Sequence, residues 1–266
     1  MTKLSNPIHL SARLQALADM VTEGMTVADV GCDHGFLDIY LVQSGKSPRA
    51  VAMDVRTGPL AAAAEHIREY GLEDRIVTRL SDGLEQYRTG EAGTLVCAGM
   101  GGPLMQRILT AYPEKTDSFE EMILQPQSEI REFRVFLREN GYRILAEKIL
   151  IEDGKYYFPM KVRIVDSEAK VSSGGKDTCT ACLENDGDVR WQEVTDRYGE
   201  KLILQKDPLL KDYLLWQKKT YTSIRDGLSR QEGEDQTAAS GDRRLRRIRE
   251  VEMELEYLQM ALERIG

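Results

Sequence analysis

The chain has 266 residues, 41% of them hydrophobic, which suffices for one large domain or two unequal ones, and no apolar run approaches the roughly 20 residues of a membrane span. The formal net charge of −8 excludes a uniformly basic surface. From residue 189 onward, however, Lys and Arg balance Asp and Glu, so the composition allows a local basic surface there. The four cysteines indicate reduced thiols, and the N-terminus lacks the apolar region of a signal peptide. Both features predict a cytoplasmic protein without membrane contact.

Short β-type runs alternate with helix-length segments, such as 58–70, through about residue 165. This alternation predicts a mostly parallel sheet with helices on both faces. The pair Asp153-Gly154 is a hairpin signal, so the last strand should run antiparallel to its neighbour. Five parallel strands and a terminal hairpin are typical of an α/β, Rossmann-like class I methyltransferase domain with a mixed seven-stranded sheet. The expected strands are 27–30, 50–53, 76–78, 94–97, 122–124, 143–150 and 156–165.

A polar segment containing Ser-Ser-Gly-Gly predicts a linker at residues 167–188, between domains 1–166 and 189–266. The linker contains Cys179-x-x-Cys182. This pair lacks a second pair of ligands, so we predict no metal site.

The tail is predicted to form a helical coiled-coil hairpin. Asp207-Pro208 suits the start of a helix that extends to about Leu228, and a polar loop is expected at 231–241. Apolar residues then recur every three or four positions, as in a coiled-coil seam. These seam residues are Ile248, Val251, Leu255, Leu258, Leu262 and Ile265. We expect a monomer, with weak dimerisation through this hairpin left open.

The segment ADVGCDHGFLDIYLV, residues 28–42, indicates a strand, a glycine turn and a helix. Dinucleotide cofactors place a pyrophosphate at such a turn, and the carboxylate of Asp33 would repel it. S-adenosylmethionine has no phosphate and carries sulfonium and ammonium cations, so Asp33 favours this cofactor. The alternative is that Asp33 only caps the helix that begins near Phe36.

Acidic residues and glycines also follow the next three predicted strands. Asp54-Val55 follows the second strand, where an acidic residue commonly binds ribose hydroxyls, although a plain surface aspartate is the alternative. Asp82-Gly83 follows the third strand, and residues 97–103, CAGMGGP, follow the fourth. Because ligands of such sheets lie beyond the carboxyl ends of the strands, these segments should meet at one site.

Several motifs of this chain together resemble the bacterial TrmK family, which methylates N1 of adenosine 22 in tRNA with S-adenosylmethionine. The motifs are LSARL (10–14), ADVGCDHGFL (28–37), SDGL (81–84), AGMGG (98–102) and LQP (124–126). The resemblance implies a class I domain, a coiled-coil domain and tRNA as the partner. With the strand-end pattern, it gives the expected cofactor contacts: Asp29, Gly31, Asp33, His34, Gly35, Asp54, Val55, Asp82, Gly83, Ala98, Gly99, Met100 and Gly101.

Methylation of N1 makes adenine cationic, so a carboxylate, or a base acting on the N6 amino group, could stabilise the product. Asp33 and His34 are the catalytic candidates, and a purely structural histidine is the alternative for His34. Gln125 is expected at the adenine edge, or as a loop-capping amide, and Arg13 at the RNA or the site edge.

N1 is used in base pairing, so the enzyme must hold RNA whose target base is exposed. Arginines crowd the start of the last helix, with Leu245 and Ile248 expected in the seam among them. They are expected to contact tRNA phosphates, while ion pairs with the glutamates that follow are the alternative. These arginines are Arg243, Arg244, Arg246, Arg247 and Arg249. A methyltransferase with another substrate, and a non-catalytic S-adenosylmethionine or RNA sensor, remain alternatives.

Overall fold

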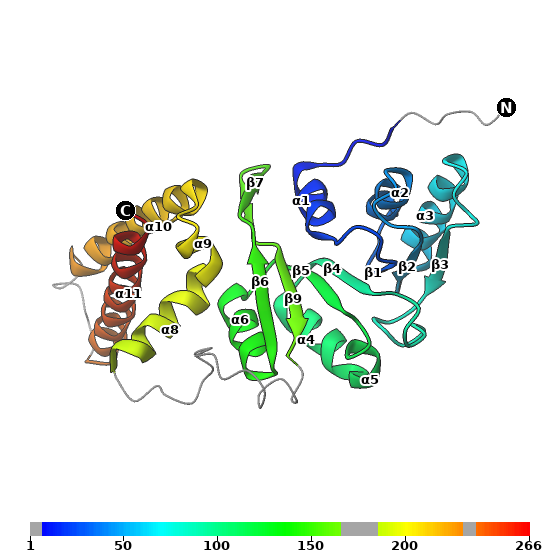
Figure 1. Cartoon of the computed structure of the whole chain (residues 1–266). Helices are drawn as coiled ribbons and strands as arrows, with labels where there is room; N and C mark the ends of the chain where they lie inside the picture. The colour runs from blue at the N-terminus through cyan, green and yellow to red at the C-terminus, as the bar shows by residue number, and fades with distance from the viewer. Residues whose placement is uncertain (1–6, 166–185, 231–237) are drawn as a thin grey trace. The chain divides into compact units, whose positions relative to one another are not determined.

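The computed structural model describes residues 7–165, 186–230 and 238–266 and divides into two compact units, 1–174 and 175–266 (Figure 1). Cys179, Cys182 and most of the predicted linker 167–188 lie outside the described residues. The last three residues of that predicted linker already belong to a helix, α8 (Asp186–Tyr198). The predicted domain limits therefore stay a prediction.

A mixed seven-stranded sheet forms the centre of the first unit, as predicted. Its order is β3-β2-β1-β4-β5-β9-β6, and its first five strands run parallel, whereas β9 is antiparallel to both β5 and β6. The strands are β1 (Val27–Val30), β2 (Ala50–Asp54), β3 (Ile76–Leu80), β4 (Thr94–Met100), β5 (Glu121–Pro126), β6 (Tyr142–Glu147) and β9 (Met160–Ile164).

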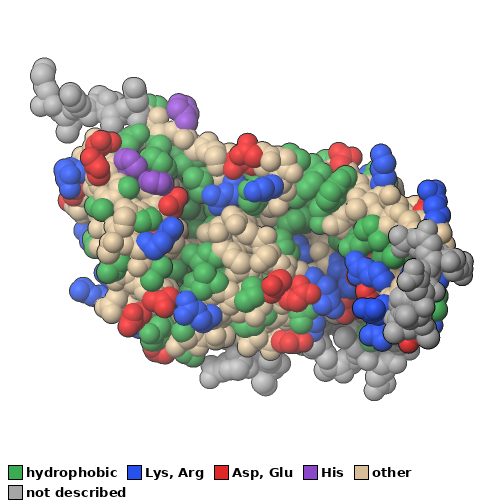
Figure 2. Space-filling view, turned by 180° about the vertical axis from the view of Figure 1, so that it is seen from behind, with side chains coloured by type: hydrophobic (Ala, Val, Ile, Leu, Met, Phe, Trp, Pro, Cys, Tyr) green, Lys and Arg blue, Asp and Glu red, His purple; other side chains and the backbone are tan. Residues whose placement is uncertain are grey.

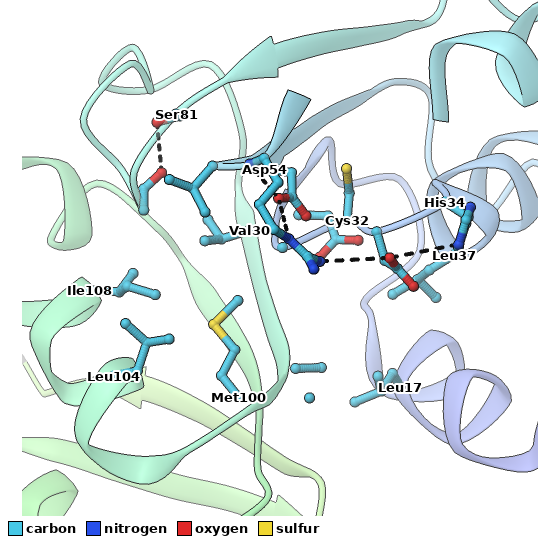
Figure 3. A pocket seen from close by; sticks show the side chains of 18 of the residues that line it. Leu17, Val30, Cys32, His34, Leu37, Asp54, Ser81, Met100, Leu104 and Ile108 are labelled. Carbon is cyan, nitrogen blue, oxygen red and sulfur yellow. Dashed lines mark hydrogen bonds and ion pairs between the residues drawn. The ribbon is translucent and has the colours of Figure 1, made fainter. Parts of the chain in front are cut away.

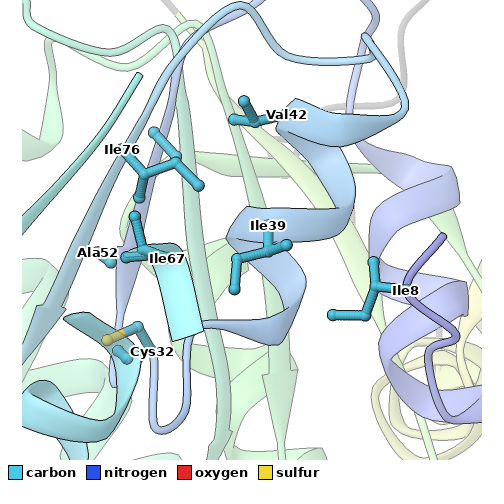
Figure 4. Packing of buried hydrophobic residues seen from close by; sticks show 9 residues of the cluster. Ile8, Cys32, Ile39, Val42, Ala52, Ile67 and Ile76 are labelled. Atoms are coloured by element: carbon cyan, nitrogen blue, oxygen red, sulfur yellow. The ribbon is translucent and has the colours of Figure 1, made fainter. Parts of the chain in front are cut away.

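Helices cover both faces of this sheet. On one face, Ile39 of α2 (Phe36–Gln43) and Ile67 of α3 (Thr57–Glu69) are buried in an apolar cluster with strand residues (Figure 4). Leu17 of α1 (Ala12–Met20) is buried in a second cluster with strand residues. On the other face, α4 (Gly102–Ala111) and α6 (Ile130–Glu139) contact each other and the strands β4 and β6. A short α5 (Pro113–Thr116) follows α4. The sheet is thus buried between two helical layers, and its polar strand ends are where a ligand can enter.

The predicted hairpin turn is present, but the strands around it are shorter than predicted. Asp153 (φ 50°) and Gly154 (φ 73°) are both left-handed, as a tight hairpin turn requires. They join β7 (Leu150–Glu152) to β8 (Lys155–Tyr157) in a separate two-stranded sheet. Pro159 has no N–H to donate to a ladder, and β9 begins only after it, at Met160.

The second unit contains the predicted antiparallel helix pair, α10 (Pro208–Arg230) and α11 (Ala238–Ile265). Asp207 caps α10 as predicted, since its side chain accepts hydrogen bonds from the N–H groups of Leu209 (2.8 Å) and Leu210 (3.2 Å). The six predicted seam residues are all buried or half-buried.

Three details of the second unit differ from the prediction. Leu245 is 44% exposed, so it does not belong to the seam. The predicted loop 231–241 is too long, because α11 begins at Ala238. The helix pair is also not alone: α8 and a short α9 (Glu200–Leu204) pack on α11, and Arg197 of α8 forms an ion pair with Glu254. Among the helices that the model describes, none is long and apolar enough to cross a membrane.

Candidate functional site

A cavity of about 450 Å³ lies beyond the carboxyl ends of β1 to β4 in the first unit (Figure 3). The segments that follow these four strands all contribute to its wall, together with residues of α1 and α4, so the predicted convergence is found. Most of the predicted cofactor residues line it: Asp29, Gly31, Asp33, His34, Asp54, Val55, Asp82, Gly83, Ala98, Gly99 and Met100.

The turn after β1 is held against β2 by its backbone. The N–H groups of Gly31 and Cys32 both donate to the carbonyl of Met53, at 2.8 and 3.0 Å. Gly31 has a φ of 80°, and a Cβ built on it would lie 2.3 Å from Cε of Met100. The left-handed φ favours glycine at this position, and the Met100 side chain covers the turn from the cavity side.

Asp33 does not cap α2, so that alternative interpretation is wrong. The residue before the helix is Gly35, and no side chain caps the helix there. The side chain of Asp33 is instead 63% exposed at the cavity, 3.9 Å from Nη2 of Arg56 and 3.8 Å from Nε2 of His34. The backbone of Asp33 is left-handed (φ 52°), an uncommon conformation that turns this carboxylate outward.

His34 lines the cavity next to Asp33. Its ring is half exposed, stacks on Phe36 with ring centroids 6.0 Å apart, and lies tilted against His66 with ring centroids 5.9 Å apart. No hydrogen bond from this ring is found within the described part of the chain. The contact of Nε2 with the Asp33 carboxylate at 3.8 Å is too long for a hydrogen bond, so the ring can still exchange a proton with a ligand.

The carboxylates at the ends of β2 and β3 differ in exposure. Asp54 is 4% exposed and accepts a hydrogen bond from the N–H of Arg56 at 2.8 Å, so it is not the surface aspartate of the alternative interpretation. Asp82 is half exposed and pairs with Arg107 of α4 at 3.1 Å. Both side chains reach the same cavity. They are thus placed to bind different parts of one ligand.

Two predicted cofactor residues lie outside the cavity wall. A Cβ on Gly35 would come within 3.1 Å of the Cβ of Ala63, and one on Gly101 within 3.1 Å of Oγ of Ser128. Their observable role is close packing of α2 against α3 and of α4 against the segment after β5.

Arg13 of α1 reaches the cavity as expected, but Gln125 does not. Gln125 is fully buried, accepts a hydrogen bond from Nη1 of Arg13 at 3.3 Å and donates to the carbonyl of Pro126. The amide that lines the cavity is Gln127, two residues further on. Its position directly after the end of β5 is the only sequence signal for it.

A pair of carboxyl groups lies under the cavity, and only one of the two is among the predicted site residues. Asp29 forms part of the cavity wall, and Asp38 of α2, which was not predicted, lies fully buried in contact with it. Burial raises the pKa of Asp29 to about 7 and raises the pKa of Asp38 well above its ordinary value, with a further upward effect from the charge of Asp29. Two such carboxyls cannot both be charged at neutral pH.

The two described cysteines are not nucleophiles. Cys32 and Cys97 are free and buried. Burial first, and then the neighbouring aspartates, raise the pKa of both thiols far above the ordinary value, so both stay protonated. Within the described ranges, no group of His, Cys, Asp or Glu is arranged to hold a metal ion.

The arginines of α11 are mostly exposed, and basic side chains gather over the second unit, at the right of Figure 2. The ion-pair alternative applies to Arg247, which pairs with Glu250 at 2.8 Å. Arg244 donates to the carbonyl of Leu228 at 3.4 Å. Arg246 and Arg249 are exposed and form no ion pair with any residue that the structure describes, so the cluster is only partly neutralised.

Comparison with known proteins gives consistent similarities. A family model described as a methyltransferase domain matches residues 10–160. The tRNA (adenine(22)-N(1))-methyltransferase of Bacillus subtilis is 37% identical over 164 residues, which cover 62% of this chain and 69% of that protein. The family model covers the part of the chain that forms the cavity.

Similarity to solved structures extends over both units. The crystal structure of the B. subtilis M1A22 tRNA methyltransferase TrmK covers 96% of this chain and 99% of its own, with a TM-score of 0.75 and 28% identity. A Streptococcus pneumoniae protein with a proposed tRNA (m1A22) methyltransferase assignment, solved in complex with S-adenosyl-L-methionine, covers 96% of this chain and 100% of its own, with a TM-score of 0.74 and 25% identity.

Proposed function

This chain belongs to the TrmK family of tRNA (adenine(22)-N(1))-methyltransferases, and we propose that it transfers a methyl group from S-adenosylmethionine to N1 of adenosine 22 in tRNA. One observation carries the cofactor assignment: carboxylates from the ends of three neighbouring strands and from the turn after β1 line one cavity. The wall carries four aspartates and three arginines, so its balance of charge favours a cationic ligand over a phosphorylated one.

Different cavity residues are placed to bind different parts of the cofactor. Asp54, buried and held by the N–H of Arg56, is placed to accept hydrogen bonds from ribose hydroxyls. Asp82 would accept one from the adenine amino group of the cofactor. Gly31 and Gly99 let the ligand approach the backbone, and Asp29 and Asp33 face its cationic end. The other predicted cofactor contacts proposed on the same wall are His34, Val55, Gly83, Ala98 and Met100. Gly35 and Gly101 are proposed only to support this wall through the close packing of the helices behind it.

The target base is proposed to enter beside Gly99. A Cβ on this glycine would lie 3.5 Å from Nη1 of Arg13 and 3.6 Å from Nε2 of Gln127, so both side chains converge on it. A primary amide offers one donor group and one acceptor, which is the pattern that an adenine edge requires. We therefore assign the recognition of adenine to Gln127 in place of Gln125.

With this geometry, catalysis depends on how adenine is positioned against the methyl group and on the charges that surround it. The cofactor supplies an activated methyl group on its sulfonium sulfur. The bond from neutral adenine N1 to the methyl carbon would form as the carbon–sulfur bond breaks, with S-adenosylhomocysteine as the leaving group. The adenine ring would become cationic, and the nearby carboxylate of Asp33 would stabilise it. His34, whose ring forms no hydrogen bond within the described residues and lies beside Asp33, is proposed to accept a proton from the N6 amino group.

The arginines of α11 are proposed to bind tRNA phosphates, with Arg246 and Arg249 as the main contacts. They would hold the RNA while the target base is exposed. We further propose that the enzyme acts as a monomer in the cytoplasm, where its tRNA substrate is found.

The test is a methylation assay with the purified protein, labelled S-adenosylmethionine and an unmodified tRNA transcript. Mass spectrometry should locate 1-methyladenosine at position 22, and a transcript with guanosine at that position should remain unlabelled. Label at another nucleotide would contradict the assigned target. Cofactor binding without any methyl transfer would instead support a non-catalytic sensor.

A further inference from the structure

The contact between Asp29 and Asp38 joins the wall of the cavity to the core beneath it. Asp29 is at the third position of β1 and points to the face of the sheet that α2 covers. Asp38 lies in the first turn of α2 and is completely buried. No side-chain N–H or hydroxyl of the described residues donates to the carboxyl oxygens of Asp38. A hydrogen bond between two carboxyl groups requires a proton on one of them.

The surrounding charges decide which carboxyl holds that proton. Asp29 has cationic Arg13 of α1 nearby, which lowers its pKa, and Asp54 of β2, which raises it. The hydrogen bond with Asp38 also lowers the pKa of Asp29, whereas the charge of Asp29 raises that of Asp38. The thiols of Cys32 in the turn and of Cys97 in β4 are neutral. The other nearby acid is the exposed Asp33.

We propose that Asp38 is a positioning residue for cofactor binding: it stays protonated and donates a hydrogen bond to Asp29, which holds the Asp29 carboxylate charged and oriented toward the cationic part of S-adenosylmethionine. The inference rests on the proposed function for the identity of the ligand. It adds a residue that does not line the cavity and acts only through Asp29.

Two substitutions of Asp38 distinguish its role as a hydrogen-bond donor from its contribution to core packing. Asp38→Asn keeps an N–H donor for Asp29 and should retain the cofactor affinity of the wild type. Asp38→Leu fills a similar volume without a donor. Asp29 then keeps its proton to higher pH, so cofactor affinity at pH 7 should fall about tenfold and recover as the pH rises by about one to two units.

The measurement is isothermal titration calorimetry with S-adenosylmethionine from pH 5.5 to 8.5. Titration of the ligand's own amino group is the same for every variant and cancels in the comparison. Ser47→Ala is the matched control, because Ser47 is fully buried away from the cavity and its hydroxyl donates to the carbonyls of Met25 and Arg49. It should lower stability without moving the pH profile. If Asp38→Leu does not fold, Asp38→Ala replaces it.

An unchanged pH profile in Asp38→Leu would overturn the proposal, and so would an Asp38→Asn variant that is folded yet binds as weakly as Asp38→Leu. Nuclear magnetic resonance of carboxyl-labelled aspartate in the ligand-free protein supplies an independent readout. Asp29 should titrate near 7 in the wild type and higher in Asp38→Leu. If this titration is seen but no variant binds the cofactor, the proposed function has failed. If the variants bind the cofactor but Asp29 does not titrate near 7, the proposed hydrogen bond from Asp38 to Asp29 is wrong.

Discussion

Nη1 of Arg13 donates a hydrogen bond to Oε1 of Gln125 at 3.3 Å, which fixes a side chain of the first helix against the end of β5. The backbone of Arg13 is held as well, since its N–H donates to Oε1 of Glu152 in the β7–β8 hairpin at 3.0 Å. The guanidinium also lies 5.7 Å from the ring centre of Tyr157. A residue near the N-terminus is thus held at the cavity by two distant segments.

Arg13→Lys should therefore impair the reaction with tRNA more than the binding of cofactor. Lysine keeps the positive charge near Asp29 but lacks the planar fork that reaches Gln125. We expect kcat/KM for tRNA to fall about tenfold, the equivalent of one charge-assisted hydrogen bond of about 1.5 kcal/mol. Steady-state kinetics and calorimetry with S-adenosylmethionine check this. A tenfold loss of cofactor affinity with unchanged tRNA kinetics would place Arg13 on the cofactor instead.

Gln127→Ala should lower kcat/KM for tRNA about tenfold or more, because it removes both the donor and the acceptor proposed for the adenine edge. Cofactor affinity should change little. Gln86→Ala is the control, since Gln86 is also exposed but lies outside the cavity wall. Equal activities of the two variants and the wild type would remove Gln127 from the recognition of adenine.

Asp54→Asn should weaken S-adenosylmethionine binding about 10- to 100-fold. The loss corresponds to hydrogen bonds from ribose hydroxyls to a charged acceptor, at about 1.5–3 kcal/mol. Asp74→Asn changes an exposed aspartate elsewhere and should bind like the wild type. Calorimetry gives both dissociation constants, and wild-type affinity in Asp54→Asn would show that Asp54 has only a structural role.

The parts of this site that the sequence predicted are those that depend on local pattern and parallel topology. The four residues of β1 and the turn after them were predicted in place, and the carboxyl ends of parallel strands must lie at one edge of the sheet. This is why Asp54 and Asp82, 28 positions apart along the chain, were correctly expected at one cavity.

The remaining details depend on packing that no local pattern encodes. Whether Gln125 or Gln127 reaches the cavity depends on the register of β4 and β5, which shifts between Ala98 and Met100. Asp38 falls among apolar helix residues, and nothing in the spacing shows that its neighbour is another carboxyl group. Leu245 matched the seam spacing, but it is exposed in the fold.

The Asp29–Asp38 pair should also affect the pH dependence of stability without any ligand. The folded-state pKa of both groups is above the unfolded value, so the native state binds more protons and loses stability as the pH rises. Asp38→Asn removes one such group. From about pH 5 to 7, the free energy of unfolding of the wild type should fall more steeply than that of the variant, by about 1.4 kcal/mol per pH unit. Urea unfolding at several pH values measures both slopes, and parallel curves would show that Asp38 is not protonated in the native state.

The basic surface of α11 leads to a prediction about salt. Arg246→Ala combined with Arg249→Ala should weaken tRNA binding and flatten its dependence on salt, because each lost phosphate contact lowers the slope of log K against log salt by about 0.7 to 0.9. Lys211→Ala combined with Lys219→Ala removes the same charge from exposed positions of α10 and is the matched control. If α11 holds the phosphates, only the arginine pair changes the slope strongly. Equal slopes for both double variants would mean that net charge alone, and not this surface, attracts the tRNA.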